Sequence, residues 1–270
     1  MTEPTTPALR PPERQPRRWR HALIEYPILA AAAFSAGVLN TVAGGGTFLT
    51  FPALVYAGVP PVAANATSAV AVFPGYLGGV VGFRREIAAF DRSRLLKIVA
   101  FTTIGGFAGS LLLLISSNEA FSLVVPFLLA LATIAFAFGP HIQAWASRHG
   151  SGKAEGPFGT LLVSIYGGYF NGGLGIVLLA LFSLWGMRDI NAMNGLKNAL
   201  SFVLSAISVA TFAAAGIVAW PQAAVMMAAA TVGGYAGAPV ARALPSVAVR
   251  LIVILVGVTM SAVFSWRAFA

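Results

Sequence analysis

Long apolar stretches with short polar interruptions run through most of the chain. A helix that crosses the hydrocarbon core of a bilayer needs about 20 apolar residues, and most of the stretches approach that length. The strands of a membrane barrel would alternate apolar and polar positions, which these stretches do not do. The pattern therefore predicts an all-α polytopic membrane protein. The stretches cover residues 24–43, 47–59, 62–83, 95–115, 121–138, 158–173, 176–187, 192–219, 223–244 and 247–266.

Two of these stretches, 47–59 and 176–187, are too short to span a bilayer. Each follows a glycine cluster, at 44–46 in one case and at 172–175 in the other. Glycine interrupts a helix and lets other groups approach the backbone. Irregular backbone at membrane depth is tolerated where it is buried in protein or lines a cavity. We therefore interpret each short stretch, together with the long stretch before it, as one broken membrane element.

The chain also contains an internal repeat. Segment 103–109, TIGGFAG, closely matches segment 231–237, TVGGYAG, at an offset of 128 positions. The glycine pair 44–45 falls on the pair 172–173 at the same offset. A seven-residue match with conservative changes indicates a duplication. We therefore expect a disordered basic cytoplasmic tail over residues 1–22, a first transmembrane repeat over 23–139, a cytoplasmic connecting loop over 140–157 and a second transmembrane repeat over 158–270.

Two topologies follow from two ways of counting the broken elements. One crossing each gives two homologous four-helix repeats, about eight transmembrane helices, and parallel repeats. The basic residues of the tail, of the 84–97 loop and of the connecting loop then share one side, as cytoplasmic clusters normally do. Two crossings each give ten segments as inverted five-helix repeats, with the tail and the 84–97 loop on opposite sides. The charge rule favours the first, with the N-terminus in the cytoplasm.

Composition narrows the function. Of 270 residues, 58% are hydrophobic and 9% are charged, whereas a soluble domain carries about 25% charged residues. This excludes a soluble enzyme. The net charge of +9 comes from clusters beside the spans, so it indicates membrane orientation and no nucleic-acid partner. The chain has no cysteine, its three histidines lie outside the predicted spans, and it carries no nucleotide-binding or hydrolase motif. We expect no enzyme, no metal and no cofactor.

The glycine-broken segments resemble the sulfite exporter TauE/SafE family. In the first half the resemblance rests on GVLNTVAGGGT at 37–47, FPAL at 51–54 and GVPPVAANAT at 58–67. In the second half it rests on YGGYFNGGLGI at 166–176 and MNGLKN at 193–198. The resemblance extends over about residues 24–266. It implies a secondary transporter in the cell inner membrane, with repeated four-helix units, that moves sulfite, a sulfonate such as sulfoacetate or a taurine-derived sulfonate, or another small organic anion.

The substrate site is expected where the two broken elements meet. Free N–H groups at the starts of half-helices attract anions, and broken helices of transporters bind substrate at the repeat interface. The first repeat offers Asn40, Gly44, Gly45, Gly46, Thr47, Asn65 and Thr67. The second repeat offers Tyr169, Asn171, Gly172, Gly173, Gly175, Asn194, Lys197 and Asn198.

Lys197 is the most informative of these residues. It lies nine residues after Arg188, about 13 Å along a helix. A cation at membrane depth costs several kcal/mol unless it is solvated, paired or placed for an anionic ligand. Glu25, at a helix end, is the only acidic residue in the apolar stretches. We therefore expect Lys197 to meet a transient anion, with snorkelling to the interface as the alternative. Asn194 shares its helix face, and Asn198 is expected about 100° away.

Partners and coupling are less defined by the sequence. Without carboxylates in the central spans, a proton relay is not supported, and the coupling ion, H⁺ or Na⁺, stays open. We expect the pairs Gly105/Gly109 and Gly233/Gly237 to pack helices closely, within the chain or in a homodimer. The alternative function is a non-transporting membrane scaffold or assembly subunit. A partner that co-purifies in fixed proportion, without solute movement, would favour that alternative.

Overall fold

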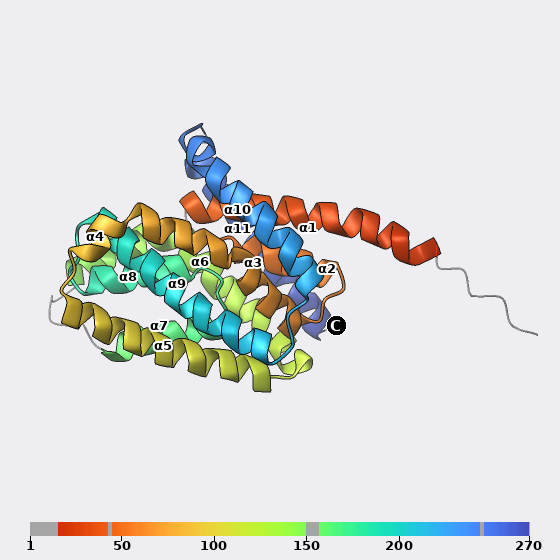
Figure 1. Cartoon of the computed structure of the whole chain (residues 1–270), viewed down its shortest axis with the longest axis horizontal. Coiled ribbons are helices and arrows are strands. Elements are labelled where there is room, and N and C mark those ends of the chain that lie inside the picture. The colour runs from red at the N-terminus through yellow and green to blue at the C-terminus, as the bar shows by residue number, and fades with distance from the viewer. Residues whose placement is uncertain (1–15, 43–44, 150–156, 244–245, 270) are drawn as a thin grey trace, which may run out of the picture.

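The computed structural model describes residues 16–42, 45–149, 157–243 and 246–269, and every element in these ranges is an α-helix. This confirms the all-α class. The helices pack into a bundle from which α1 projects (Figure 1). They are α1 Pro16–Val42, α2 Thr47–Tyr56, α3 Pro61–Gly82, α4 Arg84–Ala88, α5 Arg92–Ile115, α6 Asn118–His149, α7 Pro157–Tyr169, α8 Leu174–Leu184, α9 Ile190–Ala214, α10 Trp220–Ala243 and α11 Ser246–Phe269.

Several helix boundaries follow from local chemistry. Pro61 is the first residue of α3, where a missing N–H costs nothing. Asp91 and Asp189 cap α5 and α9, since their carboxylates accept from Arg94 N at 2.8 Å and from Asn191 N at 2.9 Å. The backbone just after α9 takes a positive φ, +70°, at Gly216. These signals are readable in the sequence, and the predicted stretches agree closely with α3, α5 and α9. Two helices are longer than expected: α1 begins at Pro16, within the segment predicted as a disordered tail, and α6 continues to His149, within the predicted connecting loop.

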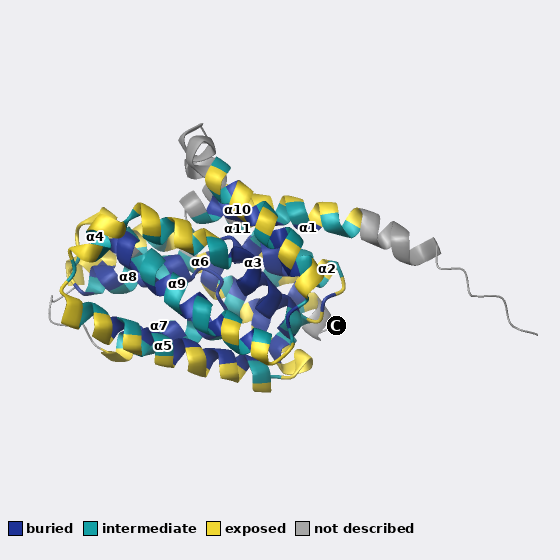
Figure 2. Cartoon of the chain, viewed as in Figure 1, coloured by how far each residue is buried: buried dark blue, intermediate teal, exposed yellow. Residues whose placement is uncertain are grey.

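The outer surface is apolar, as a membrane protein requires. Within the described residues three segments are long and apolar enough to cross a bilayer, namely Arg92–Ile115, Asn118–Ala135 and Ile190–Ala214, and shorter apolar helices accompany them. Large apolar side chains face outward on the same helices, with Ile104 57% exposed and Phe127 64% exposed. Exposed positions alternate with buried ones along α5 (Figure 2). Exposed apolar surface of this extent would be unstable in water and indicates contact with lipid.

Glycines hold two helix pairs at very short separation. A Cβ on Gly37 of α1 would overlap the Ala230 carbonyl of α10, and one on Gly109 of α5 would overlap the Ile165 carbonyl of α7. Gly105 and Gly233 make equivalent contacts with α7 and α1. Small residues allow such backbone approach between membrane helices. The expected packing role is therefore confirmed for Gly105, Gly109 and Gly233, while the surroundings of Gly237 lie outside the described residues.

The second broken element, α7 and α8, is a hairpin. Pro157 begins α7 and Trp185 directly follows α8, and both line one cavity beside the first turns of α5. The chain therefore enters and leaves at the same end of the bundle, the one that carries α4, which we call the α4 end. Gly173, with φ +70°, lies in the turn between the two helices. An L-residue with a side chain rarely adopts that conformation.

The first broken element, α1 and α2, is a hairpin from the opposite end. Glu25, in the first half of α1, accepts a 3.2 Å hydrogen bond from Gln222 at the start of α10. Thr67 in α3 accepts a 3.0 Å bond from Ala219 N, just before α10. Only residues 57–60 separate α2 from α3. Glu25 of α1, the starts of α3 and α10 and the end of α2 therefore lie together, at what we call the α2 end.

This arrangement corrects the favoured topology. We expected each broken element to count as a single crossing and the tail and the 84–97 loop to share one side. Both expectations are wrong, because each element turns back on itself and places those two segments at opposite ends of the bundle. The positive-inside rule assigns loops to sides from their basic residues, and it does not detect that the chain reverses its direction at a glycine turn.

Candidate functional site

A cavity of about 570 Å³ lies between α1, α3, α9 and α10. Four of the predicted site residues line it: Asn40 of α1 and Asn194, Lys197 and Asn198 of α9. The cavity thus joins residues 158 positions apart in the chain. The structure therefore brings these four predicted residues together in one cavity.

Helical spacing places the α9 residues. Asn194 and Lys197 are three residues apart, and Asn198 follows Asn194 by four, so all three reach the same side of the helix. Asn198 follows Lys197 directly, about 100° around the helix as expected, and it still lines the cavity as a predicted site residue. Asn198 also packs on α3, where a Cβ on Gly79 would lie 2.7 Å from its Oδ1. The close contact at Gly79 brings the α3 backbone to the cavity wall.

Lys197 is partly buried in this cavity, and no lining residue is acidic. Within the described part of the chain its ammonium has neither an ion pair nor a hydrogen bond. The other polar lining groups are amides and hydroxyls, which carry no charge at neutral pH. The cavity therefore presents one positive charge surrounded by neutral hydrogen-bonding groups.

Asn40 has a second task at the first glycine break. Its Oδ1 accepts a 2.7 Å hydrogen bond from Gly46 N and so holds the α1–α2 turn. A Cβ on Gly46 would lie 2.7 Å from Asn40 Nδ2 and 2.8 Å from the Ala36 carbonyl oxygen, which leaves no space for a side chain. Gly45 accepts from Phe48 N at 3.1 Å in the same turn. Thr47 is buried as the first residue of α2, and Gly44 lies outside the described residues.

Three predicted residues tie helices together away from this cavity. Asn65 donates a 2.8 Å hydrogen bond to the Tyr169 carbonyl at the end of α7. Thr67 accepts from Ala219 N at 3.0 Å. The Tyr169 ring packs on Phe121, with ring centroids 5.5 Å apart. Unpaired backbone groups at membrane depth are costly, so these side chains stabilise helix ends.

The second glycine break contains an unusual polar group. Asn171 is 7% exposed, and neither its Nδ2 nor its Oδ1 has a hydrogen-bond partner in the described structure. Buried side-chain amides are nearly always paired. Tyr76, which lines the cavity, lies beside this amide. Gly172 accepts from the Tyr166 hydroxyl, Gly173 forms the turn, and Gly175 lies in the first turn of α8, where N–H groups lack intrahelical partners.

Some lining residues were not predicted from the sequence. Thr231 and Tyr235 of α10 line the cavity four residues apart, within the TVGGYAG segment for which only a packing role was expected. Gly233 in the same segment does pack on α1. Polar positions four apart share a helix face, but the spacing does not show which helices that face meets. Tyr76 was missed because nothing local distinguishes it on α3.

Comparison with known proteins identifies relatives along nearly the whole chain. The model of the family "Sulfite exporter TauE/SafE" matches residues 29–264. A "Probable membrane transporter protein" of Haemophilus influenzae is 28% identical over 241 residues, which are 87% of this chain and 92% of that protein. The "Probable membrane transporter protein YfcA" of Escherichia coli K12 is 26% identical over 247 residues, 87% of each chain. No solved structure matches the chain significantly.

Proposed function

Since the chain belongs to the sulfite exporter TauE/SafE family, we propose that it is a secondary transporter of the inner membrane that moves a small sulfur-containing or organic anion. Its relatives are named membrane transporters, which supports transport as the activity. The observation that supports an anionic substrate is Lys197, an unpaired cation in a cavity without an acidic residue among its described lining. Sulfite and sulfonates such as sulfoacetate or a taurine derivative are the substrates that we propose.

Electrostatics favour this assignment. Removing an ammonium from water costs several kcal/mol at membrane depth, and an opposite charge in the same cavity offsets that cost. The amides of Asn40, Asn194 and Asn198 supply N–H donors to oxyanion oxygens. No carboxylate among the described lining residues pairs with Lys197, so its ammonium is available to an anion that enters the cavity. Such an anion is not part of the protein, so it can also leave. A permanent ion pair would stabilise the fold and would not release a cargo.

We further propose that the two halves are inverted repeats, each a re-entrant hairpin followed by three crossing helices. The bounds of α5 and α10 differ by 128 at both ends, as the sequence repeat does. The contact of α1 with α10 corresponds to that of α7 with α5 when the halves are exchanged. Inverted repeats around a mid-membrane site support alternating access.

The orientation is part of the proposal. The loops next to α4, α5, α6 and α9 at the α4 end carry seven basic residues whose side chains the structure describes, and short basic loops normally stay in the cytoplasm. We propose that this end faces the cytoplasm, which places the N-terminal tail outside and reverses the expectation for that tail. The seven residues are Arg84, Arg85, Arg92, Arg94, Lys97, Arg148 and Arg188.

Flux of sulfite and sulfoacetate into proteoliposomes tests the function. Lys197→Met keeps the length of the side chain and removes its charge, so flux is expected to fall about tenfold or more. Asn194→Asp places a carboxylate in the Lys197 cavity and is expected to block flux by occupying the ammonium. Arg85→Gln is the matched control, because Arg85 is an exposed residue of α4 outside the cavity lining.

Two results would overturn the proposal. Unchanged flux in folded Lys197→Met would remove Lys197 from the anion site. No flux of any anion by the unmodified protein, with a partner that co-purifies in fixed proportion, would favour the scaffold alternative.

A further inference from the structure

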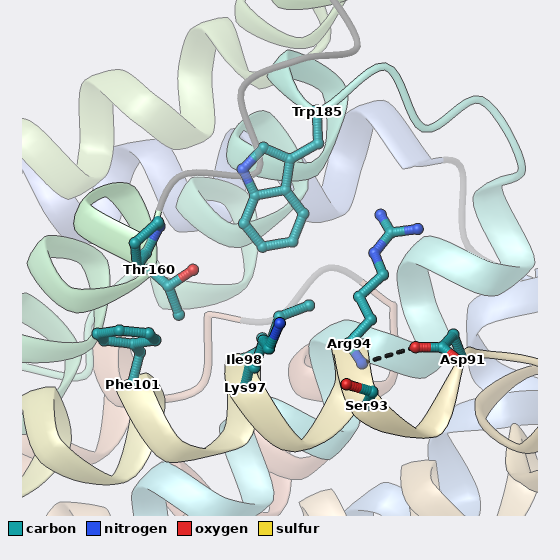
Figure 3. Close-up of a pocket in the computed structure, with 9 residues that line it drawn as sticks. Asp91, Ser93, Arg94, Lys97, Ile98, Phe101, Thr160 and Trp185 are labelled. Carbon is teal, nitrogen blue, oxygen red and sulfur yellow. Dashed lines mark hydrogen bonds between the residues drawn. The ribbon is translucent and has the colours of Figure 1, made fainter.

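A second cavity, of about 530 Å³, lies at the α4 end. It is bounded by the first turns of α5, the first turn of α7 and the residue that follows α8 (Figure 3). None of its lining residues lines the Lys197 cavity. The two cavities are therefore separate features, and the transport proposal does not use this one.

The charged lining of this cavity is mainly basic. Arg94 and Lys97 both belong to α5 and extend toward the cavity in Figure 3. Among the described lining residues Asp91 alone is acidic, and its carboxylate already accepts the Arg94 backbone N–H at 2.8 Å as a helix cap. The N-terminus of α5 adds the positive end of a 24-residue helix. The local field at this cavity thus favours a negative group.

A buried donor without an acceptor points to a ligand. Trp185 is 4% exposed, and its Nε1 has no hydrogen-bond partner in the described structure. An indole N–H can only donate, so burying it unpaired costs free energy. In Figure 3 the nitrogen lies on the side of the indole that faces Thr160, whose side chain is 2% exposed and also lines the cavity. An acceptor placed between Trp185 and Thr160 would satisfy this donor.

We propose that this cavity binds the oxyanion group of a phosphate or sulfate type of ligand, separately from the Lys197 site. Lys97 and Arg94 supply the charge, and the Trp185 indole and the Thr160 hydroxyl donate to its oxygens. Ile98 and Phe101 give the cavity an apolar wall, which suits the phosphate of an anionic lipid as well as a free ion. The shared chemistry is a multiply hydrogen-bonded oxyanion at the membrane surface.

The test uses the full chain in nanodiscs. One arm measures thermal stabilisation by inorganic phosphate and sulfate in phosphatidylcholine discs at constant ionic strength, because a ligand of the native state raises its stability. The other arm measures retention of phosphatidylglycerol against phosphatidylcholine by native mass spectrometry. For the probe that binds, Lys97→Gln is expected to lower the affinity by about tenfold or more, and Trp185→Phe by about threefold to tenfold.

Control variants distinguish binding in this cavity from binding elsewhere on the protein. Arg85→Gln removes a nearby exposed charge and Lys197→Met removes the charge of the other cavity, and both are expected to keep the binding. Stabilisation by phosphate or sulfate identifies a free ion as the ligand, and selective retention of phosphatidylglycerol identifies a lipid. Thr160→Val replaces Trp185→Phe if that variant does not fold.

Three outcomes would overturn the proposal. The first is that the unmodified protein binds neither probe. The second is that Arg85→Gln weakens binding as much as Lys97→Gln, which would indicate diffuse surface charge. The third is loss of binding in Lys197→Met, which would assign the ligand to the other cavity. A failure here leaves the flux experiment unaffected, because that experiment depends on Lys197.

Discussion

Gly109→Ala probes the glycine contact between α5 and α7 with a single added methyl group. The new Cβ would overlap the Ile165 carbonyl oxygen and would lie 2.8 Å from Tyr169 N and 3.0 Å from the Gly168 carbonyl carbon. All three neighbours are backbone atoms, so no side-chain rotation relieves the overlap. Ordinary Cβ contacts begin near 3.4 Å. The two helices must therefore move apart or tilt.

The expected magnitude follows from two opposing effects. Overpacking of this kind costs about 1–3 kcal/mol. Replacement of a helical glycine by alanine contributes about 0.5–1 kcal/mol of stability. Gly109→Ala is therefore expected to change the stability by between about zero and a loss of about 2.5 kcal/mol.

Gly78→Ala is the matched control, because Gly78 lies inside α3 with no atom within 4 Å of an added Cβ. This variant is expected to be neutral or to stabilise by up to about 1 kcal/mol. Reversible unfolding of both variants in the same mixed micelles, followed by tryptophan fluorescence, gives the difference. Equal stability of the two variants would refute the close helix contact.

The remaining predictions concern topology and buried amides. The chain lacks cysteine, so single cysteines introduced at Thr5 and Ala89 can be labelled in intact cells with a reagent that does not cross the membrane. Only one of the two positions is expected to react. If both react in intact cells, or if neither reacts until the cells are lysed, the result contradicts the opposed hairpins. Asn65→Leu breaks a 2.8 Å bond to the Tyr169 carbonyl and is expected to cost about 1–3 kcal/mol, whereas Asn171→Leu removes an amide that lies beside Tyr76 without a well-formed hydrogen bond and is expected to cost less. Chemical denaturation of the two variants measures this contrast, and a larger loss in Asn171→Leu would contradict the assigned hydrogen bonding.

Part of the candidate site was readable in the sequence. Lys197 was conspicuous because one basic residue within a long apolar stretch is costly wherever the helix lies. Asn194 followed from helical spacing. Thr231 and Tyr235 lie on another helix, and their approach to Lys197 depends on the contact of α10 with α1 and α3. No local pattern specifies that contact, so these residues could not be assigned to the site.

The predicted roles of Asn65 and Thr67 show a second kind of limit. Both were candidates for anion contact because they follow Pro60 and Pro61 near a helix start. The structure gives each a backbone partner far away in the chain, the Tyr169 carbonyl and Ala219 N respectively. A polar side chain in an apolar helix signals that a partner exists. The fold decides which partner it is.

The sequence by itself determined the helical class, the contact with lipid and the places where the helices break. Those properties depend on length, hydropathy and glycine positions, which act locally. Only the tertiary structure decided that each break reverses the chain. A glycine cluster permits either continuation or reversal at similar local cost, and packing selects between them. Here α1 lies against α10 and α7 against α5, through glycine contacts between residues far apart in the sequence, and that long-range packing sets the direction of both hairpins.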